Sequence, residues 1–291
     1  MIRILKAKNA PRPPKADARE RSLAIVFLQA IRSAAQKTNE AALAAALEEK
    51  NTDRAVATVR WDAVQEVLGE ALPKRYRLIY EEGLRKSRLE AKRFRKDGAG
   101  TGFDYTDPES VAWARDRAGR LIYEFGAMSR EALRALIARA FIEGIPPREL
   151  ARLIRDSGIG LTQRQAEAVV RRRAQLIKDG RKLDQVDRMT DRYAAQLLRQ
   201  RAEAIARTEI IEAHTAGTQA GWREAIDEGL LPPDFFQIWI AGQTERTCDL
   251  CAQLHDTKAK LGESFGDDYD GNPIYGPPAH PQCRCSLGLS E

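Results

Sequence analysis

The sequence predicts a mainly α-helical protein with a small C-terminal α+β region. Apolar residues recur at i, i+3 and i+4 through most of residues 17–227, the spacing of long amphipathic helices. After Pro232-Pro233 the chain becomes aromatic and β-branched, and then rich in Gly, Asp and Pro. All four Cys lie in the last 44 residues. Together these observations predict long helices followed by a short-stranded, loop-rich module stapled by Cys and His.

The composition excludes a membrane-spanning or disordered chain. The 291 residues are 43 % hydrophobic and 31 % charged, with a mean hydropathy of −0.49, the balance of a soluble protein. No apolar run approaches the ~18 residues that a membrane span needs. The N-terminus also lacks the apolar stretch of a secretory signal. We therefore expect folding in the cytoplasm, no membrane anchor and reduced cysteines.

Positive charge is concentrated at the front of the chain. Residues 1–97 hold 22 Lys and Arg against 13 Asp and Glu, residues 98–230 hold 22 against 20, and residues 231–291 hold 4 against 9. Any contact with a polyanion is therefore expected in the first third, with an ordinary solvated surface as the alternative. The candidate DNA or phosphate ligands are Arg3, Lys6, Lys8, Arg12, Lys15, Arg93, Arg95 and Lys96.

The N-terminal third divides into an arm and a helical domain. Residues 1–16 carry three Pro among basic residues and predict a basic flexible arm. Residues 17–97 predict a basic helical domain. Its first helix should cover 17–50 with a break near Thr38–Asn39, and its second should cover 53–94 with an interruption at Pro73.

A Gly-rich linker over 98–107 leads into a second helical domain over 108–230. Thr106 or Asp107 should cap a helix that begins at Pro108, and Ser129 should open another that ends at Gly144. Further helices are expected over 148–156, 162–178 and 190–227, with Gly229 capping the last. Residues 231–291 should form the Cys/His-containing module, with strands over 235–240 and 284–289, packed on the helix over 190–227.

A cluster of metal-ligating residue types carries the chemistry of this module. Cys248 and Cys251 form a C-x2-C pair, and a second group of His and Cys follows after 28 intervening residues. Thiolate and imidazole are zinc ligands, so we expect a structural zinc held by four of the five residues. The candidate ligands are Cys248, Cys251, His280, Cys283 and Cys285. Packed reduced thiols, a disulfide or a catalytic thiol are the alternatives.

A structural site is favoured over a catalytic one, because the sequence contains neither H-E-x-x-H nor H-x-E…P-C-x-x-C. No catalytic residue is assigned. Arg207, Thr208 and Glu209 form a polar group on an otherwise apolar helix. We expect them to act as a structural tether, with Glu209 pairing with Arg246 or bonding loop amides near the Cys pair. A solvated Glu209 is the alternative.

Three motifs in order resemble the Mu F-like minor head proteins of tailed phages and prophages, also called head morphogenesis proteins. They are Ala206-Arg-Thr-Glu209, Arg246-Thr-Cys-Asp-Leu-Cys251, and Pro277-Pro-Ala-His-Pro-Gln-Cys-Arg-Cys285. The resemblance covers roughly residues 100–289, and residues 1–97 are similar only in being helical and basic. Leu254-His-Asp-Thr257 lacks the Gly that the family usually has after the Cys pair.

The resemblance implies a non-enzymatic virion component at the portal vertex inside the capsid, present in the host cytoplasm during assembly. It implies the portal protein as partner, with the major capsid or scaffolding protein as further candidates, and a role in head assembly, DNA packaging or ejection. DNA contact would be non-specific, since no base-reading motif is present. The alternatives are a zinc-dependent enzyme or toxin-related module, and a zinc-ribbon DNA-binding protein.

Overall fold

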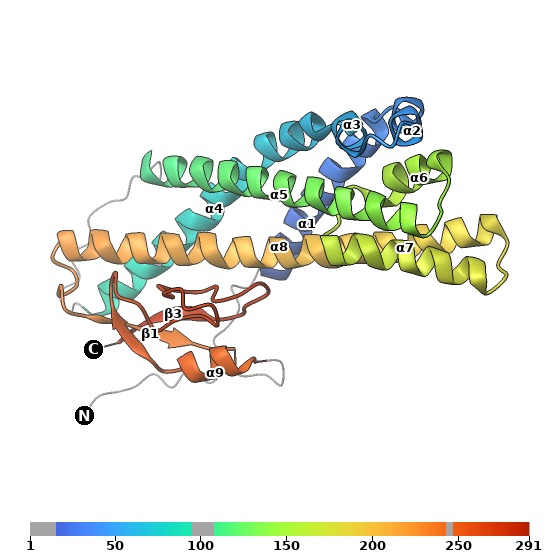
Figure 1. The fold of residues 1–291 in the computed structure, drawn as a ribbon. Helices are drawn as coiled ribbons and strands as arrows, with labels where there is room; N and C mark the ends of the chain where they lie inside the picture. Colours follow the sequence, from blue (N-terminus) through green and yellow to red (C-terminus); the bar gives the residue numbers. More distant parts are fainter. Residues whose placement is uncertain (1–15, 95–107, 243–246, 291) are drawn as a thin grey trace. The chain divides into compact units, whose positions relative to one another are not determined.

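The computed structural model describes residues 16–94, 108–242 and 247–290, and it confirms the predicted fold class (Figure 1). Long helices precede a small antiparallel sheet that lies near the C-terminus. The helices are α1 (Ala16–Lys37), α2 (Glu40–Glu48), α3 (Thr52–Thr58), α4 (Trp61–Phe94), α5 (Pro108–Ile142), α6 (Pro147–Leu153), the π-helical turn η1 (Ile154–Gly158), α7 (Gln163–Lys178), α8 (Leu183–Asp227) and α9 (Asp249–Leu254). The strands are β1 (Phe236–Ile240), β2 (Lys258–Lys260) and β3 (Ser286–Ser290).

The chain forms two compact units, and each is built from separate stretches of sequence. The first unit contains residues 1–21, 73–115 and 204–291, and the second contains residues 22–72 and 116–203, each within the described ranges. Helices α1, α4, α5 and α8 therefore contribute residues to both units. None of the described helices is long and apolar enough to cross a membrane.

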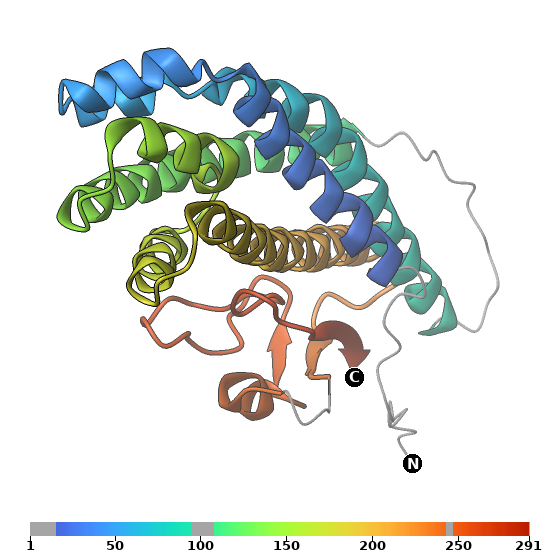
Figure 2. The same ribbon diagram turned by 90° about the vertical axis from the view of Figure 1, so that its right-hand side faces the viewer.

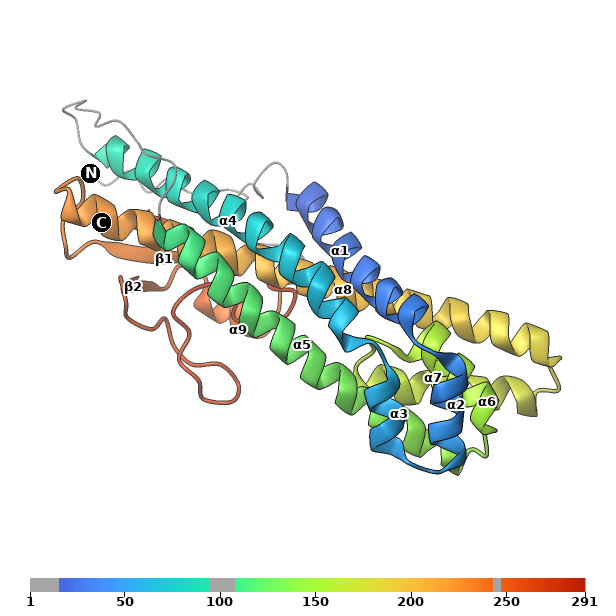
Figure 3. The same cartoon turned by 90° about the horizontal axis from the view of Figure 1, so that it is seen from above.

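In the first unit, the C-terminal half of α4 lies beside the C-terminal part of α8 (Figure 3). A Cβ atom added at Gly217 would overlap the carbonyl oxygen of Tyr80, and one added at Gly83 would overlap that of His214. Only glycine allows the two backbones to approach so closely. Arg88 then joins the helices by hydrogen bonds of 2.5 Å to Glu224 and 2.6 Å to Glu228.

The sheet of the first unit has the order β2-β1-β3, and both pairings are antiparallel. Alternate residues of β1 are buried, as a strand with one face on the core requires. The core between this sheet and α8 contains Trp222 against Phe235, with ring centroids 5.7 Å apart, and Trp239 against Phe265 at 5.4 Å. Figure 2 shows the strands alongside α8.

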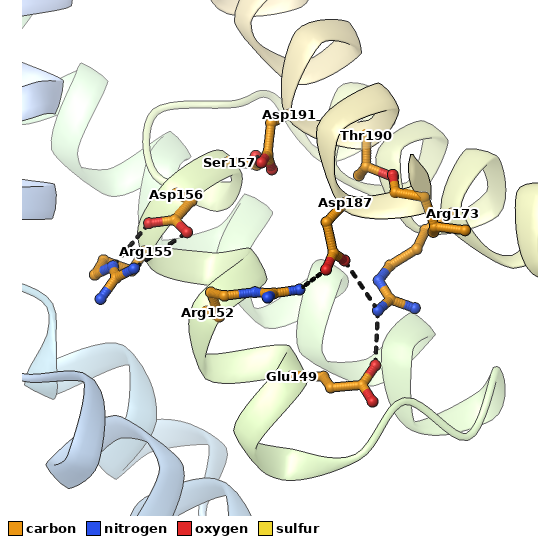
Figure 4. A network of polar contacts seen from close by, with 10 residues as sticks. Glu149, Arg152, Arg155, Asp156, Ser157, Arg173, Asp187, Thr190 and Asp191 are labelled. Carbon is orange, nitrogen blue, oxygen red and sulfur yellow. Dashed lines mark hydrogen bonds and ion pairs between the residues drawn. The ribbon is translucent and has the colours of Figure 1, made fainter. Parts of the chain in front are cut away.

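In the second unit, α7 packs antiparallel on the N-terminal part of α8 (Figure 1). Thr162 and Gln165 form a capping box at the start of α7. A network of ion pairs links α6, α7 and α8, and in it Asp187 lies between Arg152 and the buried Arg173 (Figure 4). Arg173 is only 2 % exposed and also bonds Glu149 at 2.6 Å, so its charge is fully compensated.

Several predicted helix boundaries are confirmed. The first helical stretch breaks at Thr38–Asn39, α5 begins at Pro108, and α7 begins after Thr162. Gly229, at φ 67°, ends α8 with N–H bonds from Gly229 to Ile226 and from Leu230 to Ala225.

Two predicted interruptions are wrong. Pro73 lies inside α4, and the break falls instead between α3 and α4. A proline inside a helix costs about 3 kcal/mol, but Leu68, Leu72 and Tyr76 beside it are fully buried, and each contributes roughly 1.5–3 kcal/mol. Ser129 opens no new helix, because it lies buried within α5. Helix α8 also begins at Leu183 rather than near Thr190.

Candidate metal centre

The first two candidate ligands come from the short helix α9. Cys248 is the N-cap of this helix, and its sulfur accepts a hydrogen bond of 3.4 Å from the backbone N–H of Cys251. This capping contact turns the chain so that both sulfurs lie on the same side. Cys251 is buried, whereas Cys248 is half-buried. The C-x2-C spacing therefore gives the arrangement that a shared metal requires.

His280 approaches this pair from the segment that follows the cis Pro277–Pro278 bond. Its Nδ1 atom lies 2.8 Å from the carbonyl oxygen of Pro281 and can donate to it. Nε2 is then left to face the sulfurs, 3.2 Å from Cys248 and 3.1 Å from Cys251. A metal-ligating histidine commonly donates its other ring N–H in this way, because the bond fixes the tautomer.

Cys283 and Cys285 complete the cluster from the segment just before β3. A turn in which the Cys283 N–H donates to the His280 carbonyl, at 3.1 Å, brings the Cys283 sulfur within 3.8 Å of the Cys251 sulfur. The five ligand atoms form two sets of three, Cys248/Cys251/His280 and Cys251/Cys283/Cys285. Within each set all atoms lie within 4.8 Å of one another, and Cys251 belongs to both.

These residues could hold a metal ion. Two sulfurs bound to one tetrahedral zinc at ~2.3 Å lie roughly 3.8 Å apart, which is the separation of Cys251 and Cys283. The four cysteines are free thiols rather than disulfides. Because Cys251 and Cys285 donate hydrogen bonds to its sulfur, the pKa of Cys283 lies below its usual value, and the same contact raises the pKa of Cys251. The cluster thus favours a thiolate, the form that binds metals.

The predicted tether residues lie on α8 beside the loop that carries His280 and Cys283. Thr208 accepts a hydrogen bond of 3.1 Å from the backbone N–H of Gln282, and Arg207 donates one of 3.1 Å to the Gln282 side chain. Arg207 also bonds Glu20 at 3.2 Å. Gln282 has a φ of 65°, so these contacts hold a strained turn in place. Glu209 is buried, and Arg246 lies outside the described residues.

The structure adds two residues that sequence reasoning did not assign to this site. Gln282 carries the contacts to α8, and the fully buried indole of Trp239 lies beside the Cys285 thiol. Gln282 stands inside the His280–Cys285 motif, so its position between two ligands was a usable signal. Nothing in the sequence indicated which side of β1 Trp239 would face.

The predicted DNA ligands lie almost entirely outside the described residues. Arg3, Lys6, Lys8, Arg12 and Lys15 fall in 1–15, and Arg95 and Lys96 fall in 95–107. Arg93 lies in the last turn of α4, but its side chain lies outside the described part of the structure. Their contact with DNA stays a prediction.

Comparison with known proteins gives one match. The family model described as Phage Mu protein F like protein matches residues 131–288, which is more than half of the chain. The matched stretch includes α8 and the whole Cys/His cluster. No curated protein and no solved structure matches the chain.

Proposed function

Since the chain belongs to the Phage Mu protein F like family, a family of phage head morphogenesis proteins, we propose that it is a minor head protein that binds the portal vertex inside the capsid. The observation that carries the proposal is the match over residues 131–288. In this role the portal protein is its main partner, and the major capsid or scaffolding protein is a further one. The protein supports head assembly in the host cytoplasm and remains in the virion.

The proposed role is structural rather than enzymatic. The family is a structural one that is not known as enzymatic. The candidate metal centre also has its ligands packed against one another and against the core around Trp239. A catalytic zinc keeps one position open for water or substrate, whereas a structural zinc is closed by four protein ligands.

We also propose that the cluster holds a structural zinc ion. Cys248, Cys251 and Cys283 would supply three ligands, with His280 or Cys285 as the fourth. When bound, zinc would crosslink α9 to the segment before β3 and so stabilise a module whose sheet is small. The contacts of Arg207 and Thr208 with Gln282 would position the second half of the ligand set.

Contact with packaged DNA is the remaining part of the proposal. Phosphates would be bound through the basic residues of the N-terminal arm and the end of α4, without sequence preference. Such contact would aid packaging or ejection while the helical units face other head proteins.

The head role is tested by tracing the protein through assembly in cells that carry the phage or prophage. Affinity-tagged protein should co-purify with the portal protein, and mass spectrometry of purified virions should detect a few copies per particle. A deletion should yield defective heads, which a plasmid-borne copy restores. Normal, infectious heads from the deletion, with no trace of the protein in wild-type virions, would contradict the proposal.

The zinc proposal is tested by atomic emission on protein purified under reducing conditions. We expect about one zinc per chain and a lower melting temperature after chelation. Protein without metal, whose melting temperature does not change with chelator or added zinc, would overturn the zinc site while leaving the head role intact.

A further inference from the structure

A strongly basic surface lies on the hairpin formed by α7 and the start of α8. Residues 163–199 hold ten Lys and Arg against five Asp and Glu, although residues 98–230 as a whole are nearly neutral. The charge summed over residues 98–230 therefore does not reveal the positive charge of this hairpin. The hairpin belongs to the second unit.

The acidic residues of the hairpin are already engaged by other partners. Asp187 binds Arg152 and the buried Arg173, and Asp191 accepts a hydrogen bond of 2.7 Å from Ser157 (Figure 4). On the outside, Glu167 and Asp184 pair with Arg171 and Arg188, each within its own helix. Asp179 accepts a bond of 2.7 Å from the Gln175 amide. No carboxylate of the hairpin is left over for its remaining cations.

Seven exposed cations of the hairpin consequently make no ion pair with any part of the chain that the structure describes: two lie on α8 (Arg192 and Arg199), and five lie on α7 and the turn after it. We call these five the basic hairpin face: Arg164, Arg172, Lys178, Arg181 and Lys182. The turn that presents the last two is fixed, because Gly180 at φ 72° accompanies N–H bonds from Gly180 to Ile177 and from Arg181 to Leu176. From Arg164 to Lys178 the face extends over about 20 Å of helix α7.

We propose that the basic hairpin face binds the phosphate backbone of double-stranded DNA. This inference makes the DNA contact of the proposed function more specific. It rests on the proposed function, because a position inside the head is what brings the protein to DNA. A row of separate cations without counter-ions suits a polyanion, since each phosphate contact releases a counterion. The core of a protein interface is instead apolar and depleted in charged residues overall, although Arg is enriched there. Ile177 and Leu183 are exposed apolar residues at the hairpin tip. A protein partner would use them, whereas DNA would not, so replacing them distinguishes the two kinds of partner.

The test measures binding of the full chain to a 30-base-pair duplex by fluorescence anisotropy at several NaCl concentrations. The hairpin variant replaces Arg172, Lys178, Arg181 and Lys182 by Gln. A control variant replaces Arg21, Arg32, Lys50 and Lys74 by Gln, which are also exposed and without ion pairs among the described residues. Both variants lose the same charge. Circular dichroism and melting temperature verify that each one folds.

We expect the hairpin variant to bind at least about tenfold more weakly at 100 mM NaCl, and the slope of log K against log salt to fall by about 3. In the control variant the slope should fall by less than about 1. Replacing Ile177 and Leu183 by Ser should leave DNA binding unchanged.

Three results would overturn the proposal. Equal losses in the hairpin and control variants would indicate a general charge effect. Loss confined to a variant with Gln at Arg3, Lys6, Lys8, Arg12 and Lys15 would place the contact in the N-terminal arm, as the proposed function has it. Unchanged DNA binding by the hairpin variant, combined with weaker portal binding by it and by the Ile177/Leu183 variant, would assign the face to an acidic protein. None of these results would remove the head role.

Discussion

Cys251 is the residue on which the candidate metal centre most depends, because it belongs to both sets of three ligand atoms. We expect Cys251→Ala to lower zinc retention the most, since it removes a ligand atom from both sets at once. His280→Ala and Cys285→Ala each leave one set of three intact and should retain part of the metal. The zinc content of the three purified variants, measured side by side, checks this expected order of zinc retention. Wild-type zinc content in Cys251→Ala would contradict it.

His214 makes the stability of the first unit depend on pH. Burial, together with the nearby positive charges of Lys86 and Arg19, lowers the pKa of His214 from 6.5 to about 4. The unfolded chain therefore takes up a proton below about pH 6.5, where the folded chain does not. Stability attributable to this residue is present above pH 6.5 and is lost progressively as the pH falls towards 4. At ~1.4 kcal/mol per pKa unit, the loss reaches up to about 3 kcal/mol.

Urea unfolding at pH 7 and pH 5 measures this effect in wild type and His214→Asn. The variant should lose less free energy of unfolding than the wild type between the two pH values. Its residual loss reports the other titrating groups. Equal losses in the two proteins would show that His214 does not control the dependence.

At the scale of elements, the close approach of α4 and α8 depends on glycine. We expect Gly217→Ala to destabilise the protein by several kcal/mol, because the added methyl overlaps the Tyr80 carbonyl and neither backbone can yield cheaply. Chemical unfolding measures the change. The matched control is Gly119→Ala in α5, where no atom lies within 4 Å of the new methyl, so it should stabilise by about 0.5–1 kcal/mol. Similar effects of the two substitutions would refute the argument.

The helices that were predicted correctly are those whose ends carry local signals. Asn39, Thr162 and Gly229 each satisfy backbone groups at the end of a helix, through their own side chain or backbone geometry. A short stretch of sequence is therefore enough to predict these helix ends. The signals at Pro73 and Ser129 were equally local, but there packing by distant residues decides the outcome. Strand β2 has three residues and pairs only with β1, so its sequence alone does not reveal it.

In the candidate metal centre, too, some features follow from local sequence and others depend on distant residues. Residue type and spacing identified all five candidate ligands, since Cys and His side chains are metal ligands wherever they stand in the fold. Their grouping around Cys251, and the contact of Thr208 with Gln282, depend on where α8 meets a loop some 70 residues later. Likewise, the basic hairpin face exists because contacts within the hairpin and with Arg152 and Ser157 occupy its carboxylates, which the composition cannot show.

At the scale of the whole molecule, the two units are interleaved along the chain. The family-matched residues 131–288 lack residues 73–94, which pack on α8 through Gly83, Arg88 and their neighbours. We therefore expect a fragment of residues 131–288 to unfold without a cooperative transition, whereas residues 16–290 melt cooperatively. Circular dichroism of the two fragments checks this prediction. A cooperative melt of the shorter fragment at the same temperature would contradict it.

The interleaving also fixes the order in which the molecule can form on the ribosome. The residues of α4 at 73–94 need α8 and the sheet as partners, and these leave the ribosome more than a hundred residues later. The second unit, completed by residue 203, can close first, while the apolar side of α4 remains uncovered. Nascent chains stalled before and after residue 227 should therefore differ sharply in protease resistance at α4. Chaperone binding during translation is expected in that interval.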